Sequence, residues 1–215
     1  MDLIPGPPPT SFRDSMATTY DNVAAQRDEM GEADWRWPLA ERFLTKLQDE
    51  DKSRLLEIGA GVGYTSLWFA ERGLDVVATD LSPAQVEIAR AKGLDAYVRD
   101  MFDLSFPAES FDAAWAMNCI HHIPSDDLPA VLAGIADILR PSALFYAAVW
   151  GGRDIEGMYE NDFYQPARFF AIRSDESLRA ALETAFVVES FETFLPDEQK
   201  DDDGLHMQSF LLRKL

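Results

Sequence analysis

The sequence contains only one cysteine, Cys119, and three histidines among its 215 residues. A single thiol excludes an internal disulfide, and so few thiol and imidazole groups cannot form a zinc cluster of the usual spacing. We therefore expect no bound metal and a reducing compartment, the cytoplasm. No stretch approaches the roughly 18 apolar residues of a membrane-spanning helix, so we also expect no membrane partner.

Basic residues are scarce as well. Lys and Arg number 19 against 38 Asp and Glu, which gives a formal net charge of -19. A protein with this charge repels phosphate backbones, so we expect no nucleic acid partner. Hydrophobic residues make up 47% of the chain, enough for one globular domain with a sizeable core, which excludes disorder as its general state.

The chain divides into three parts. Residues 1–12 contain Pro5 and a run of three prolines at positions 7–9, and we predict a disordered leader there. Residues 13–50 carry apolar side chains at helix spacing, including Leu39, Phe43 and Leu47, and predict N-terminal cap helices. Residues 51–215 form the main domain, with a lid inserted at about 151–173, a segment too long for an ordinary connection.

In the main domain, short apolar runs alternate with helical patterns. The predicted strands are 54–59, 75–80, 96–100, 111–118 and 143–150. The predicted helices between them are 63–72, 83–92, with Ser82 as its N-cap, and about 126–139. Such alternation predicts a doubly wound α/β sheet, mostly parallel. A further helix at 175–184 precedes two β-patterned runs, 186–194 and 205–215, which are joined by an acidic loop and should pair antiparallel. The sheet then has about seven strands.

A glycine-rich turn follows the first predicted strand, in the segment LLEIGAGVGYTSLWFA. Gly59, Gly61 and Gly63 let backbone amides approach a ligand at the carboxyl end of that strand, where open α/β sheets bind ligands. Asp80 ends the next strand and is placed to accept hydrogen bonds from ribose hydroxyls. The pattern indicates a nucleoside ligand.

Two residues argue against a dinucleotide. Tyr64 stands where the dinucleotide-binding fingerprint needs glycine or alanine. Glu57 would bring a carboxylate close to the negative charge of a pyrophosphate. No GKS or GKT follows the glycines, so a nucleotide-triphosphate loop is absent. A carboxylate suits a nucleoside that carries an ammonium and a sulfonium and no phosphate, which is S-adenosyl-L-methionine.

The ordered set of motifs resembles the class I S-adenosylmethionine-dependent methyltransferases, in their branch of small bacterial enzymes acting on metabolites. The motifs are EIGAGVG at 57–63, ATDLS at 78–82, RDMFDLSFPAESFD at 99–112, NCIHHIP at 118–124 and LRP at 139–141. The resemblance covers about residues 15–215. It implies a Rossmann-like seven-stranded sheet, mostly parallel with an antiparallel C-terminal strand.

The resemblance also implies the cofactor contacts. Glu57, Gly59 and Gly61, with Ala60 in the same turn, would contact the methionine moiety, and Asp80 would bind the ribose. Leu81, Asp100 and Met101 would lie at the adenine. We further expect Asn118 to receive the amino group through its backbone carbonyl, and Tyr20 and Arg27 to close over the carboxylate.

Methyl transfer from a sulfonium is an in-line displacement, so the protein mainly aligns the acceptor and, where needed, removes its proton. His121 and His122 follow the fourth strand at the edge that faces the methyl group, and either could act as the base. The alternative is that these histidines only pack. Cys119 is not expected to act as a nucleophile, because the reaction needs no covalent intermediate.

We expect the cap helices and the lid to form the acceptor pocket. Its candidate residues are Trp35, Trp150, Tyr164 and Arg168, which favour a flat or aromatic small molecule. The alternatives are that the aromatic rings belong to the core and that Arg168 pairs with Glu160 or Asp162 instead of an acidic substrate.

The sequence thus predicts a methyltransferase that acts on an oxygen or nitrogen atom of a small molecule, with transfer to carbon as a variation. Two alternatives stay open, a peptide or protein methyltransferase and a cofactor-binding module without transfer. A basic peptide would be attracted to the acidic surface. Edge strands and N-terminal helices in this fold can mediate a homodimer.

Overall fold

A computed structural model describes residues 2–196 and 204–215. Its helices are α1 (Phe12–Asn22), α2 (Ala24–Met30), α3 (Arg36–Asp49), α4 (Tyr64–Ala70), α5 (Pro83–Ala91), α6 (Leu128–Ile138) and α7 (Asp175–Leu182), with a short 3-10 helix, η1 (Ile120–His122). Its strands are β1 (Leu3–Pro5), β2 (Arg54–Ile58), β3 (Asp75–Asp80), β4 (Asp95–Val98), β5 (Phe111–Met117), β6 (Leu139–Gly151), β7 (Ile155–Tyr159), β8 (Phe169–Ile172), β9 (Phe186–Phe194) and β10 (His206–Lys214).

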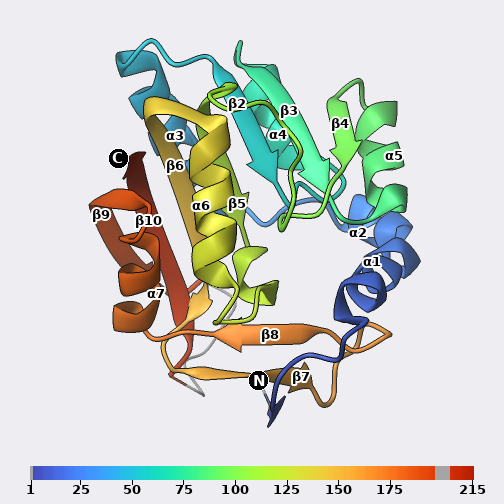
Figure 1. Cartoon of the computed structure of the whole chain (residues 1–215). Coiled ribbons are helices and arrows are strands. Elements are labelled where there is room, and N and C mark those ends of the chain that lie inside the picture. The colour runs from blue at the N-terminus through green and yellow to red at the C-terminus, as the bar shows by residue number, and fades with distance from the viewer. Residues whose placement is uncertain (1, 197–203) are drawn as a thin grey trace.

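The main sheet has seven strands in the order β4-β3-β2-β5-β6-β10-β9 (Figure 1). Strands β2 to β6 pair in parallel, and β10 runs antiparallel to both β6 and β9. The predicted fold class, including the antiparallel C-terminal strand, is confirmed. The acidic run at 201–203, expected to be a loop, lies outside the described residues.

Side chains of the central strands point alternately to the two faces of the sheet and pack into two separate hydrophobic cores, as expected for a sheet covered on both faces. In β2, Leu56 and Ile58 join the cluster that α6 and α7 cover, whereas Leu55 joins the cluster under α3 and α4. Helix α5 packs through Val86 and Ala89 in a smaller third cluster beside β3 and β4. The buried sheet therefore fixes the carboxyl ends of β2, β3 and β5, where the ligand site is expected.

The prediction of a disordered leader at residues 1–12 is wrong for the residues that form β1 and for the start of α1. Leu3–Pro5 form β1, which pairs antiparallel with β7, and Phe12 already begins α1. Strand β1 is an edge strand of a three-stranded sheet with β7 and β8, a position that tolerates the missing amide hydrogen of Pro5. Gly157 makes the pairing possible, because a Cβ there would collide with the carbonyl oxygen of Ile4.

The segment expected as a lid, 151–173, supplies β7 and β8. In Figure 1 these two strands lie across the end of the main sheet near which α1 also lies. The N-terminal cap consists of three helices, with α1 and α2 separated at Val23. No helix among the described residues is both long and apolar enough to cross a membrane.

Candidate functional site

The glycine turn after β2 is shaped by its neighbours. Gly59 and Gly61 have positive φ angles of 69° and 59°, which L side chains rarely adopt. A Cβ on Gly59 would lie 2.6 Å from the Cβ of Cys119. Burial raises the pKa of the Cys119 thiol, and its Sγ donates to the carbonyl oxygen of Ile58 at 3.2 Å. Cys119 is therefore a packing partner of the turn and stays protonated.

Asp80, at the end of β3, joins the glycine turn to the start of α5. Its Oδ2 accepts from the amide of Gly61 at 2.8 Å, and its Oδ1 accepts from the amide of Ser82 at 2.9 Å. Ser82 is the N-cap of α5, as the sequence predicts, and its hydroxyl accepts from the amide of Gln85. Burial raises the pKa of Asp80 in spite of these bonds.

Glu57 contributes a second carboxyl group, which is more deeply buried than that of Asp80. Its side chain lies on β2, only 4% of the residue is exposed, and its Oε2 accepts from the hydroxyl of Ser66. Burial raises its pKa to about 8, with the nearby charges of Glu32 and Asp80 acting in the same direction. Because Glu57 and Asp80 line one cavity, a positively charged ligand there would favour ionisation of both.

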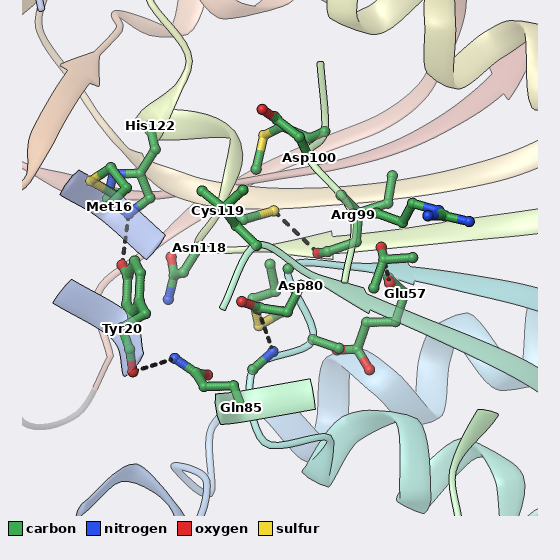
Figure 2. Close-up of a pocket in the computed structure, with 18 of the residues that line it drawn as sticks. Met16, Tyr20, Glu57, Asp80, Gln85, Arg99, Asp100, Asn118, Cys119 and His122 are labelled. Atoms are coloured by element: carbon green, nitrogen blue, oxygen red, sulfur yellow. Dashed lines mark hydrogen bonds between the residues drawn. The ribbon is translucent and has the colours of Figure 1, made fainter. Parts of the chain in front are cut away.

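This cavity lies at the carboxyl ends of β2, β3 and β5 and encloses about 930 Å³, its open mouth included (Figure 2). Every residue predicted to contact the cofactor lines it: Tyr20, Arg27, Glu57, Gly59, Ala60, Gly61, Asp80, Leu81, Asp100, Met101 and Asn118.

Asn118 has an unusual backbone at the end of β5. Its φ angle is 55°, and its side-chain Oδ1 is buried with no hydrogen-bond partner among the described residues. An unpaired buried acceptor costs free energy that a ligand donor can recover. Figure 2 shows this amide between Tyr20 and Asp80, inside the cavity.

Helix α1 covers the cavity and supplies residues that the sequence reasoning missed. Phe12 and Met16 line it together with Tyr20, and the three share one helix face because they are four residues apart. That spacing is the signal that could have found them. Asp21 ties helix α1 to the start of α5, because its Oδ1 accepts from the hydroxyl of Ser82 at 2.5 Å.

Tyr20 and His122, expected in different roles, are hydrogen-bonded to each other at 2.8 Å (Figure 2). His122 Nδ1 lies 2.7 Å from the carbonyl oxygen of Phe169, which can only accept, so Nδ1 carries the hydrogen. Burial lowers the pKa of His122 to about 3, so the ring is neutral. Its Nε2 therefore accepts from the Tyr20 hydroxyl, and both ring nitrogens are engaged.

Arg168 approaches Tyr20 from the lid segment. Its guanidinium pairs with the fully buried carboxylate of Asp162 through Nε at 2.7 Å and Nη2 at 2.9 Å. The remaining Nη1 lies 3.5 Å from the Tyr20 hydroxyl. Of the two uses considered for Arg168, the structure contains the ion pair with Asp162, and the residue does not line the cavity.

The other expected acceptor residues lie apart from the cavity lining. Trp35 packs against Phe194, with ring centroids 5.7 Å apart, and Trp150 is partly buried between two hydrophobic clusters. Tyr164 is buried in the lid segment. His121 is buried against Phe170 and does not line the cavity, whereas His122 does.

Two arginines near the glycine turn differ in their partners. Arg36 Nε lies 2.9 Å from Glu32 Oε2, and both residues line the cavity although the sequence reasoning did not select them. Arg27 has no carboxylate partner among the described residues, and its guanidinium lies 6.0 Å from the ring centre of Tyr20. Arg27 is therefore a cation of the cavity lining that is available to an anionic ligand group.

The sequence of this chain is similar to those of known methyltransferases. Residues 55–142 match the family model described as a methyltransferase domain. A ubiquinone biosynthesis O-methyltransferase of Hahella chejuensis is 32% identical over 52% of this chain and 50% of its own length. The methyltransferase GfsG of Streptomyces halstedii is 30% identical over 60% of this chain and 49% of its own length. The chain thus spans about half the length of these curated relatives.

Solved structures share the fold over almost the whole chain. The 1,6-didemethyltoxoflavin-N1-methyltransferase of Burkholderia thailandensis, with 1,6-didemethyltoxoflavin and S-adenosylhomocysteine bound, superposes with a TM-score of 0.70 at 22% identity. It covers 99% of this chain and 94% of its own. The [4+2]-cyclase SpnF gives a TM-score of 0.69 at 22% identity and covers 99% of both chains.

Proposed function

We propose that this chain, a member of the class I S-adenosylmethionine-dependent methyltransferases, transfers a methyl group from that cofactor to an oxygen or nitrogen atom of a small molecule. One observation carries the proposal: the buried carboxyl group of Glu57, the partly buried carboxyl group of Asp80 and the unpaired Asn118 amide oxygen line the same cavity as a glycine turn. This combination suits a nucleoside that carries cationic groups and no phosphate.

The cavity offers a suitable residue for each part of the cofactor. Glu57 and the backbone carbonyl of Asn118 would accept hydrogen bonds from the ammonium group, and Arg27 would pair with the carboxylate. Asp80 would accept from the ribose hydroxyls, since each of its oxygens uses only one of its lone pairs on the backbone amides of Gly61 and Ser82. Leu81, Asp100 and Met101 would surround the adenine.

When bound, S-adenosylmethionine supplies a methyl group that is already activated on a sulfonium. The protein then mainly has to orient the acceptor and exclude water, and α1 covers the cavity for both purposes. We propose that His122 holds the Tyr20 hydroxyl in place. A neutral imidazole of such low pKa would be a weak general base, so an acceptor that is already deprotonated suits this site best.

The relatives support a small-molecule acceptor. Their names include a ubiquinone biosynthesis O-methyltransferase and a toxoflavin-precursor N1-methyltransferase. The apolar side chains of Phe12, Met16 and Phe102 on the cavity wall favour a flat acceptor. The acceptor roles expected for Trp35, Trp150, Tyr164 and Arg168 stay predictions, as does a base role for His121.

A second candidate function is ligand binding or another reaction without methyl transfer. Two observations favour it: both nitrogens of His122 are occupied, and one solved structure of this fold is named as a [4+2]-cyclase. Incubation with methyl-labelled S-adenosylmethionine and separate pools of small metabolites and basic peptides distinguishes the candidates. Label in the small-molecule pool supports our proposal. Label in peptides alone, or in neither pool while S-adenosylhomocysteine binds, contradicts it.

We also propose a cytoplasmic location without nucleic acid partners, supported by the single cysteine and the net charge of -19. A homodimer through an edge strand or the N-terminal helices stays a prediction that light scattering can test.

A further inference from the structure

Helix α2 has little hydrophobic anchorage, although it carries a residue of the cavity. Ala24 is its only buried residue, and Met30 at its end is 68% exposed. Arg27 in the same helix lines the cavity. Burial of one alanine contributes too little free energy to hold a seven-residue helix in one orientation. Polar contacts must therefore fix the position of Arg27.

Three residues outside the cavity lining supply such contacts: Asp28, Tyr64 and Lys92, which we call the clamp cluster. The Lys92 ammonium lies 2.6 Å from Asp28 Oδ1 and 3.7 Å from the ring centre of Tyr64. The Tyr64 hydroxyl donates to the carbonyl oxygen of Asp28 at 2.6 Å. All three residues thus contact one another.

The clamp cluster joins two parts of the cavity wall. Lys92 also donates to the carbonyl oxygen of Val62 at 2.8 Å, and Val62 lies between Gly61 and Gly63 of the glycine turn. Asp28 directly follows Arg27. The cluster therefore fixes the residue next to Arg27 to the residue next to Gly61. The Lys92 side chain is only 18% exposed, which limits screening of its charge by solvent.

We propose that the clamp cluster is a positioning device that holds Arg27 toward the carboxylate of the cofactor's amino-acid moiety. The inference rests on the proposed function. Arg27 can take this role because no carboxylate among the described residues forms an ion pair with it, whereas Arg36 pairs with Glu32. A cation fixed before the ligand arrives loses less conformational entropy on binding, so the cluster raises affinity without touching the ligand.

The experiment compares two ligands that differ at the amino-acid moiety. S-Adenosylhomocysteine has a carboxylate, whereas 5′-methylthioadenosine has the same nucleoside and no amino-acid group. Tyr64→Phe removes one hydroxyl and keeps the ring, and Lys92→Met removes the ammonium. Lys46→Met is the matched control, because Lys46 of α3 forms an ion pair with Glu50 at the C-cap of that helix and does not line the cavity.

Calorimetry should give a clear pattern. Tyr64→Phe and Lys92→Met should each weaken S-adenosylhomocysteine binding about three- to tenfold, part of the value of a charge-assisted hydrogen bond, and should change 5′-methylthioadenosine binding less than about twofold. In an Arg27→Met background the same changes should cause no further loss. Lys46→Met should bind both ligands like the wild type.

Three results would overturn the clamp: equal losses for both ligands, unchanged affinity for S-adenosylhomocysteine, or losses that add to that of Arg27→Met. Equal losses would indicate a general structural role for the cluster. If the wild-type protein binds neither ligand, the proposed function fails and the inference fails with it. If it binds S-adenosylhomocysteine while the cluster variants behave like the control, only the inference fails.

Discussion

Glu57→Gln should change how stability depends on pH, because the carboxyl group is buried and no cation among the described residues forms an ion pair with it. Its pKa rises from the ordinary value of 4.5 to about 8. Between these values the folded protein keeps a proton that the unfolded chain releases, so stability is present below about pH 4.5 and is lost as pH rises through 8. The slope approaches about 1.4 kcal/mol per pH unit, which makes the loss between pH 5 and 8 about 3 kcal/mol.

The variant carries a neutral amide of the same shape, which can still accept from the Ser66 hydroxyl, and it lacks this dependence. Urea unfolding of both proteins without ligand, followed by tryptophan fluorescence at pH 5, 6, 7 and 8, measures the difference directly. The stability of Glu57→Gln relative to the wild type should rise by about 3 kcal/mol across this range. Parallel curves would refute the reasoning. Glu41→Gln, a change at an exposed carboxylate of α3, is the control and should run parallel to the wild type.

Three further predictions concern neighbouring residues. Asp80→Asn should weaken S-adenosylhomocysteine binding by about 10- to 100-fold through the loss of charge-assisted hydrogen bonds, and unchanged affinity in calorimetry would remove Asp80 from the ribose. Gly59→Ala should destabilise the fold by about 2 kcal/mol more than Gly73→Ala, because both glycines have positive φ but only the Cβ at 59 meets a neighbour; equal unfolding energies would contradict this. The His122 ring should stay neutral in NMR titrations from pH 5 to 8, and a protonation step in that range would contradict the hydrogen-bond assignment.

The glycine turn and Asp80 were predictable from sequence because both belong to one continuous strand, turn and helix pattern. Strand β3 was predicted with its observed bounds, 75–80, and Ser82 was correctly predicted as the N-cap of α5. In a parallel sheet, the carboxyl ends of consecutive strands lie at the same edge. Motifs that follow two such strands therefore predict a shared cavity, and no knowledge of distant contacts is needed.

The contacts that close the cavity depend on residues far apart in sequence. Tyr20 and His122 are 102 positions apart, and no local pattern links them. Strand β1 forms only because β7 supplies Gly157 opposite Pro5, which explains why a proline-rich segment was wrongly expected to be disordered. For Arg168 the sequence leaves an acceptor role and a pair with Glu160 or Asp162 open, and only the folded lid segment brings its guanidinium against Asp162.

The most direct test of the central claim is calorimetric titration of the wild-type protein with S-adenosylhomocysteine and, separately, with NAD. The carboxyl groups of Glu57 and Asp80 in the cavity predict one-site binding of S-adenosylhomocysteine at micromolar affinity or tighter and no binding of the pyrophosphate-containing NAD. Binding of NAD without binding of S-adenosylhomocysteine would contradict the assignment of this cavity.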